Sequence, residues 1–338
     1  MLKYFYMSKK GLVRKAELYK KLKEYCKMIG GAQQLVEQLL EFSVFYGAAR
    51  KEEGPGVIRK YFQSLDCRSI STEQDKFERV HIALQGLRLF QVSQVFPLIY
   101  AAIGAFVRSG GGNSRSLAKM FIRLLESMEK YHFINNAVCD RVGNEVEKLY
   151  ADFCVQYEQS TDFEKTTSDF IEAIKKQVAS EDEFRIRFCE ICYSADTLSL
   201  IAYIFDRMSN NGLDPGERTR IFNPEKGMRR RNHNIEHFLP QNPAEKSASE
   251  PDESVAVDNI GNLLAISFRA NSSLGNLSPA KKIEALKGKL AKRIHNLPYV
   301  NAFIQRYEKL SASWDNAAIA KRAEDLSIEA YGDVWLIK

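Results

Sequence analysis

The sequence lacks the features of several common protein classes. Its longest apolar run, residues 96–107, is about 12 residues long, whereas a membrane-spanning helix needs roughly 20. We therefore expect a buried helix there and no membrane partner. No apolar segment of signal length follows the first residues, where Lys9 and Lys10 come early. The six cysteines are scattered along the chain, which favours a reducing, cytoplasmic location.

Two patterns that often bind ligands are incomplete. Cys189 and Cys192 have a spacing common in zinc sites, but no second Cys or Cys/His pair follows at zinc-ribbon distance. We interpret them mostly as core residues of a helical segment. The triple glycine at 110–112 lacks the Lys-Ser/Thr of a P-loop, so it predicts a loop between two helices.

The composition allows a large folded protein. The chain has 338 residues, of which 45% are apolar and 11% aromatic, which is enough for two domains with cores of their own. The formal charge of +6 permits a polyanionic partner, but many proteins without such a partner have a similar charge.

The first two thirds of the chain have apolar residues at helical spacing. We expect helices over residues 15–28, 32–44, 116–131, 144–156, 161–178, 181–193 and 197–208. Turn-forming residues at 210–216 then mark a connection, and the composition changes to Asn, His, Pro and Ser. The predicted domains are therefore a helical domain, 1–222, and a second domain, 223–338.

The second domain is predicted to contain strands as well as helices. A short strand is expected from Ile235, a polar loop over residues 242–253 and a second strand over 262–268. A helix should begin at Ser278-Pro279 and continue to Ile294, because apolar residues keep helical spacing over that range, and a last helical region should cover 299–331. The fold class is thus mainly α with a small α+β domain.

The Glu236-His237 pair carries the most specific chemistry. Neutral imidazole accepts protons near neutral pH, so His237 is the candidate general base, and Asn262 on the neighbouring strand could orient it. Carboxylate and amide oxygens suit Mg²⁺ or Mn²⁺, which makes Glu236 and Asn271 candidate ligands. Because strand side chains alternate, Glu236 and His237 point to opposite faces unless the strand end is twisted.

Plainer interpretations stay open for these residues. His237 could be a core histidine, and Asn259 and Asn262 could be turn residues beside Gly261. Basic residues near the motif could contact phosphates or simply face solvent. The candidate DNA contacts are Arg229, Arg230, Arg231, Lys281, Lys282 and Lys289.

A family resemblance rests on four segments, residues 235–241, 260–264, 271 and 274–276. They resemble the C-terminal nuclease domain of GmrSD-type, modification-dependent restriction enzymes, which belongs to the HNH or His-Me finger superfamily. The nine-residue step from Asn262 to Asn271 is similar to the step between the second and third HNH motif letters, with Asn in place of the last His. Residues similar to the closing helical signature of these proteins are Trp314, Ile319, Arg322, Leu326 and Trp335.

The resemblance implies a helical bundle domain followed by a ββα-metal, or His-Me finger, nuclease domain with extra helices. In it, His237 would be the general base, Asn262 its orienting partner, and Asn271 with Glu236 the site of one divalent cation, Mg²⁺ or Mn²⁺. Members usually carry an N-terminal ParB-like nucleotide-binding domain, of which this sequence shows no trace. A fragment, or a separate nucleotide-binding subunit, is therefore expected.

The resulting hypothesis is a metal-dependent DNA endonuclease in restriction or anti-phage defence. Its expected partner is DNA, and whether that DNA is modified stays open. The alternative is a catalytically inactive DNA-binding or assembly subunit that retains the finger fold. The two differ in whether Glu236 and Asn271 can share one cation beside His237.

Overall fold

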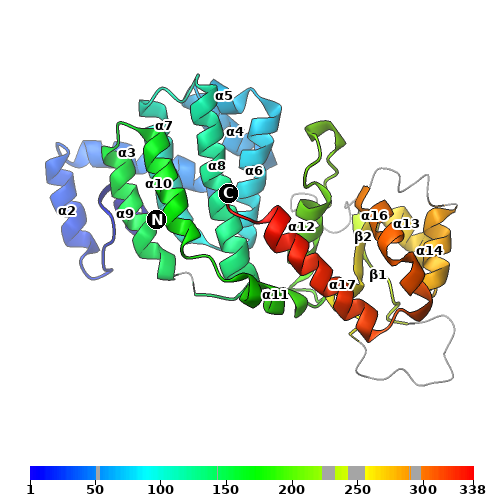
Figure 1. Ribbon diagram of the computed structural model, residues 1–338. Helices are drawn as coiled ribbons and strands as arrows, with labels where there is room; N and C mark the ends of the chain where they lie inside the picture. Colours follow the sequence, from blue (N-terminus) through cyan, green and yellow to red (C-terminus); the bar gives the residue numbers. More distant parts are fainter. Residues whose placement is uncertain (51–53, 143, 223–232, 243–255, 289, 291–297) are drawn as a thin grey trace. The chain divides into compact units, whose positions relative to one another are not determined.

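The computed structural model describes the chain except residues 51–53, 143, 223–232, 243–255, 289 and 291–297. It divides into two compact units, Met1–Val178 with Ile337–Lys338, and Ala179–Leu336. The described residues are mainly helical, with one two-stranded sheet (Figure 1). The prediction of a mainly α chain with a small strand-containing part is confirmed. None of the described helices is long and apolar enough to cross a bilayer.

The first unit consists of helices around one large apolar core. Its central helix is α7, Phe96–Arg108, the apolar run of the sequence, in which most side chains are buried. The other α-helices are α1 (Leu2–Lys10), α2 (Leu18–Met28), α3 (Ala32–Arg50), α4 (Gly54–Ser64), α5 (Arg68–Ser71), α6 (Gln74–Leu89), α8 (Arg115–His132), α9 (Asn144–Gln159) and α10 (Phe163–Lys175). The short turns are η1 (Ser93–Val95) and η2 (Phe133–Val138).

The triple glycine forms the predicted connection between α7 and α8. A Cβ atom at Gly111 would lie 2.3 Å from ring atoms of Phe106, and one at Gly112 would lie 2.8 Å from the carbonyl oxygen of Asp66. Close packing therefore explains these glycines, because a larger residue would collide with its neighbours. The loop ends at Ser114, whose Oγ accepts a hydrogen bond from the backbone N–H of Leu117 and caps α8.

The second unit surrounds a two-stranded antiparallel sheet. Strand β1, His233–His237, pairs with β2, Leu263–Ser267, and His237 lies opposite Leu263. The helices are α11 (Glu181–Cys189), α12 (Leu198–Ser209), α13 (Phe268–Leu274), α14 (Pro279–Lys287), α16 (Pro298–Tyr307) and α17 (Asn316–Glu329). Short turns are η3 (Pro215–Glu217), η6 (Ile260–Asn262), η7 (Glu308–Ser313) and η8 (Ala330–Val334). Figure 1 shows α13, α14 and α16 gathered beside the sheet.

One apolar core holds this sheet and its helices together. Leu264 and Ile266 of β2 pack in it with Phe238, with α13 and α14, and with Trp314 before α17. Arg322 of α17 is buried as well, and it donates hydrogen bonds of 2.7 Å to the carbonyl oxygens of Gly261 and Leu263. These bonds fix η6 and the start of β2, where Leu263 lies opposite His237.

Several details differ from the sequence-based expectations. Residues 268–274 form α13, capped by the Ser267 hydroxyl, where the sequence analysis predicted no helix and placed residue 268 at the end of the second strand. Helix α14 ends at Lys287 before Gly288, whereas the expected helix continued to residue 294, which lies outside the described residues. Helices α11 and α12 belong to the second compact unit, which begins at Ala179. The predicted domain boundary near residue 222 stays a prediction.

All six cysteines are free. Cys189 and Cys192, which the sequence analysis interpreted mostly as core residues, are not fully buried. Cys189 is half-buried at the end of α11, whereas Cys192 is exposed and lies outside the helix. The predicted helix over 181–193 therefore ends early. Cys192 instead forms a backbone bridge with Asn259, which brings the segment after α11 to the loop before β2.

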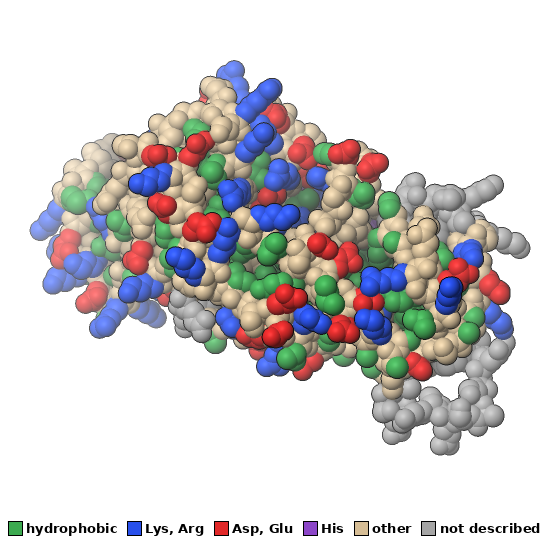
Figure 2. Space-filling model, viewed as in Figure 1, with side chains coloured by type: hydrophobic (Ala, Val, Ile, Leu, Met, Phe, Trp, Pro, Cys, Tyr) green, Lys and Arg blue, Asp and Glu red, His purple; other side chains and the backbone are tan. Residues whose placement is uncertain are grey.

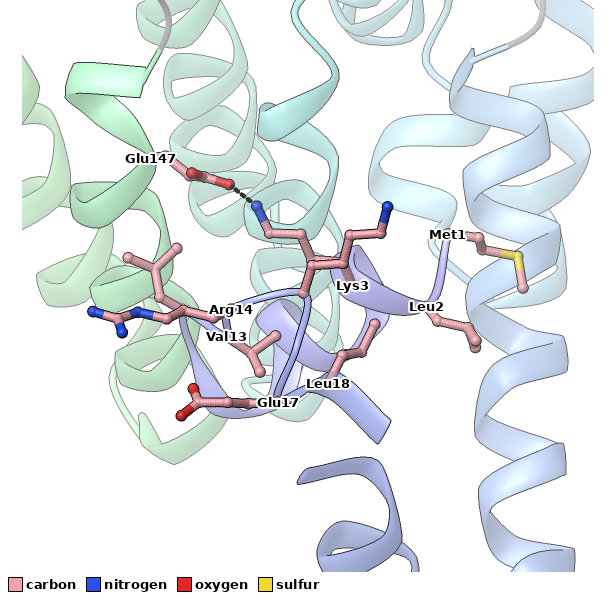
Figure 3. A pocket seen from close by; sticks show the side chains of 10 residues that line it. Met1, Leu2, Lys3, Val13, Arg14, Glu17, Leu18 and Glu147 are labelled. Atoms are coloured by element: carbon pink, nitrogen blue, oxygen red, sulfur yellow. Dashed lines mark hydrogen bonds and ion pairs between the residues drawn. The ribbon is translucent and has the colours of Figure 1, made fainter. Parts of the chain in front are cut away.

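The visible surface carries charges of both signs, and the first unit contains a cavity. Figure 2 shows acidic and basic side chains interspersed over the described surface of the visible face. A cavity of about 1050 Å³ lies beside α1 and is lined by residues such as Leu12, Val13 and Arg14 (Figure 3). At its edge Lys3 Nζ lies 2.6 Å from Glu147 Oε1. None of the predicted site residues lines this cavity.

Candidate active site

The end of β1 presents His237 and Glu236 to different surroundings. His237 contacts Asp258 and Tyr193, whereas Glu236 contacts Lys282 of α14. This separation follows from the alternation of side chains along a strand, which the sequence analysis anticipated. The two side chains therefore contact different partners, and Lys282 is close to both residues because its Nζ also lies 2.6 Å from the carbonyl oxygen of His237.

His237 is paired with a carboxylate. Its Nε2 atom lies 3.0 Å from Asp258 Oδ1, and the ring packs edge-on against Tyr193 at a centroid distance of 4.8 Å. An ionised carboxylate only accepts hydrogen bonds, so Nε2 must carry the hydrogen. In the neutral ring, the lone pair is then on Nδ1, which is the atom that can accept a proton.

The electrostatic surroundings keep His237 neutral near pH 7. Burial lowers the pKa of the imidazole below its usual 6.5, while the Asp258 carboxylate acts in the opposite direction. The side chain keeps 13% of its surface exposed. A neutral, partly accessible imidazole with a fixed tautomer has the properties required of a general base.

Asp258 is a site residue that the sequence analysis did not assign. Its Oδ1 also accepts a hydrogen bond of 2.7 Å from Gln241 Nε2, and its carbonyl oxygen accepts one of 2.7 Å from the Tyr193 N–H. The backbone pairing of residues 191–193 with 258–260 thus holds both Asp258 and Tyr193 against His237. The sequence feature that could have identified Asp258 is its position at the start of the motif segment that ends with Asn262.

Asn262 has a different role from the predicted contact with His237. It is fully buried, and its Oδ1 accepts hydrogen bonds from the Leu239 N–H and from Trp314 Nε1. Its Nδ2 donates to the carbonyl oxygens of Leu239 and Val257. These bonds occupy both donors and both acceptor positions of the amide. Asn262 therefore fixes the two ends of the loop between the strands, and Asp258 is the partner of His237.

Glu236 forms a buried ion pair. Its Oε1 lies 2.5 Å from Nζ of Lys282, and the Lys282 side chain is 0% exposed. The two groups form an ion pair without a well-directed hydrogen bond at Oε1. Burial raises the pKa of the Glu236 carboxyl and the Lys282 ammonium opposes this change, while burial also lowers the pKa of Lys282. Lys282 Nζ additionally donates to the carbonyl oxygen of His237 at 2.6 Å.

Asn271 has an unsatisfied oxygen. It lies on α13, which packs against both strands, and its Oδ1 is buried without a hydrogen-bond partner. Buried polar atoms are usually paired, so this oxygen is unusual. No group of three or more His, Cys, Asp or Glu side chains suited to a metal ion occurs among the described residues. An oxygen from Glu236 and one from Asn271 nevertheless fit the donor type that Mg²⁺ prefers, since this ion keeps several waters.

The predicted DNA contacts fall into three groups. Arg229, Arg230, Arg231 and Lys289 lie outside the described residues. Lys281 is exposed on α14, and its proposed phosphate contact stays a prediction. Lys282 is buried in the pair with Glu236, so the structure does not place it on a solvated basic face.

The comparison with sequence families matches this part of the chain. Residues 178–328 match the family described as GmrSD restriction endonucleases, C-terminal domain. The match covers β1, β2, α13 and α14, and it suggests a restriction-type nuclease. The resemblance to the C-terminal region of GmrSD-type enzymes is thus confirmed, whereas the HNH class stays a prediction. The comparisons with curated proteins and with solved structures gave no match.

Proposed function

We propose that this chain is a DNA endonuclease of the restriction type that hydrolyses phosphodiester bonds with His237 as general base and one divalent cation. The observation that carries the proposal is the His237–Asp258 pair, found within the residues that match the restriction endonuclease family. The order β1, β2, α13, with His237 on the first strand and Asn271 on the helix, supports a ββα, His-Me finger arrangement.

In the proposed reaction, Nδ1 of His237 accepts a proton from water, and the oxygen of that water attacks the phosphorus atom. The bond from phosphorus to the leaving sugar oxygen breaks, that oxygen takes up a proton from solvent water, and the imidazolium later returns its proton to solvent. Asp258 stabilises the imidazolium that forms, because its carboxylate accepts from Nε2. Glu236 and Asn271 would hold the cation, which would supply charge stabilisation at the phosphate.

The test is cleavage of supercoiled plasmid and of modified phage DNA by the purified chain with Mg²⁺, Mn²⁺ or EDTA. We expect cutting only with a metal and a loss of roughly 10²- to 10⁴-fold in His237→Ala. His233→Gln is a matched control, because this histidine lies on the same strand opposite Ser267 and should retain activity. Full activity of His237→Ala would refute the mechanism.

Two further outcomes address partners. DNA binding without cleavage under all metal conditions would support the alternative, a subunit that binds DNA or assembles with other proteins. Cleavage that appears only after addition of a nucleotide-binding subunit and a nucleoside triphosphate would support the separate-subunit hypothesis.

A further inference from the structure

Lys282 is unusual in being a fully buried lysine at the candidate site. An ammonium group has three N–H donors, and Lys282 directs its charge to Glu236 Oε1 at 2.5 Å and donates to the His237 carbonyl oxygen at 2.6 Å. Burying two charges carries a desolvation penalty that an apolar pair of similar volume would avoid. Stability alone is thus a weak explanation for placing an ion pair here.

Two side-chain oxygens on elements that pack together suggest why the charge is there. Glu236 has a buried carboxylate whose Oε1 is paired with the Lys282 ammonium, and Asn271 Oδ1 is buried without any hydrogen-bond partner. Helix α13, which carries Asn271, packs against the strand that carries Glu236. The Lys282 ammonium neutralises the first oxygen, and the second has no hydrogen-bond partner. A divalent cation between them would satisfy both.

We propose that Lys282 is an internal counter-ion that competes with the divalent cation for Glu236. The inference rests on the cation of the proposed function and adds the residue that controls its binding. Because two cations at one carboxylate repel each other, the incoming metal would displace the Lys282 ammonium. In the absence of metal, the ammonium would keep Glu236 neutralised and the end of β1 ordered through the His237 carbonyl oxygen.

The first test measures Mn²⁺ affinity by isothermal titration calorimetry on the full chain. Coupling between two binding events typically changes affinity by roughly 5- to 150-fold, so Lys282→Met should bind Mn²⁺ at least about fivefold more tightly. Lys287→Met is the matched control, because it removes the same charge from an exposed position of α14. Glu236→Gln should abolish binding at this site.

The second test uses the unsubstituted chain and does not depend on the folding of a variant. Acetic anhydride modifies accessible lysine amines, and mass spectrometry locates the products. Lys282 should be protected without metal and should become reactive when Mn²⁺ is added, whereas the reactivity of Lys287 should stay constant. Protection of Lys282 that is unchanged at saturating Mn²⁺ would overturn the proposal.

The outcomes separate this inference from the proposed function. An unchanged Mn²⁺ affinity in Lys282→Met, or no binding by either protein, refutes the competition even if the chain cleaves DNA by another arrangement. Tighter binding in Lys282→Met with loss of binding in Glu236→Gln supports the competition even if no DNA is cut.

Discussion

The carboxylate of Asp258 accepts a hydrogen bond from Nε2 of His237 over 3.0 Å, across a separation of 21 residues. The bond assigns the proton to Nε2 and leaves Nδ1 as the basic nitrogen. It also counteracts the effect of burial, which lowers the pKa of His237. The chemistry proposed for His237 therefore depends on a residue from the loop before β2.

Replacing Asp258 with Asn should lower kcat/KM for DNA cleavage by roughly 10- to 100-fold, the usual effect of losing a partner that orients a functional side chain. Since the carboxylate raises the pKa of His237, its removal should also move the acid limb of the pH profile to lower pH. Both quantities come from initial rates measured between pH 5 and pH 8, a range of about one to two units around the ordinary pKa of histidine.

The matched control for this charge change is Asp214→Asn, which lies on an exposed position of the same unit. It should leave the rate and the acid limb unchanged. A profile of Asp258→Asn that coincides with that of the unsubstituted chain would show that the pair does not act in catalysis.

Asn262→Ala should affect stability more than the Asp258 substitution does. The side chain of Asn262 makes four hydrogen bonds in a fully buried position. Their loss leaves buried groups unpaired and should lower the free energy of unfolding by roughly 2 to 4 kcal/mol. Urea unfolding followed by tryptophan fluorescence measures this, because Trp314 and Trp335 both lie in the second unit. Equal unfolding midpoints for Asn262→Ala and Asp258→Asn would contradict the assignment.

Asn271→Ala should leave the stability nearly unchanged and weaken Mn²⁺ binding. The Oδ1 of Asn271 has no hydrogen-bond partner, so its removal should change the free energy of unfolding by no more than about 0.5 kcal/mol. If the oxygen is a ligand, Mn²⁺ affinity should fall by at least about tenfold. Calorimetric titration and urea unfolding of the same preparation test both parts. A destabilised variant with unchanged Mn²⁺ affinity would assign Asn271 to packing.

The sequence was informative where periodicity and motif spacing determine structure locally. The apolar spacing predicted α2, α3, α8, α9 and α10 of the first unit, the apolar run predicted α7, and the motif identified the two strands β1 and β2. Asn262 was expected on the second strand but lies in η6, directly before β2. Helix α13 was missed because its seven residues, Phe268–Leu274, are too few to show a clear helical period. The end of α14 before Gly288 was missed for another reason, because the apolar spacing in the sequence continues beyond the glycine.

The pairing of site residues was harder to predict, because it depends on contacts between distant segments. Alternation along β1 correctly anticipated that Glu236 and His237 face different surroundings. The partner of His237 could not be chosen between Asn262 and Asp258 by spacing, since both follow the loop and both accept hydrogen bonds. The choice depends on the backbone pairing of residues 191–193 with 258–260, for which the sequence has no local signal.

A buried histidine in the first unit leads to a prediction about acid stability. His132 is 0% exposed, and its Nε2 lies 2.7 Å from the Tyr150 hydroxyl while its Nδ1 contacts Asn136 Oδ1. Burial lowers the pKa of His132 from 6.5 to about 4. Between these values the unfolded chain binds a proton that the folded chain does not. Stability from this group is therefore full above pH 6.5 and falls as the pH decreases toward 4.

The full difference between the two pKa values corresponds to roughly 3 kcal/mol at acid pH. Urea unfolding at pH 7.5 and pH 5 should thus show a loss in the unsubstituted chain that is smaller in His132→Gln, whose side chain does not titrate. Far-UV circular dichroism follows both units, while tryptophan fluorescence follows the second unit alone, because both tryptophans lie there. The pH effect of His132 should appear in the circular dichroism and be absent from the fluorescence. An equal pH effect in both proteins by circular dichroism would show that His132 does not govern the acid sensitivity of the first unit.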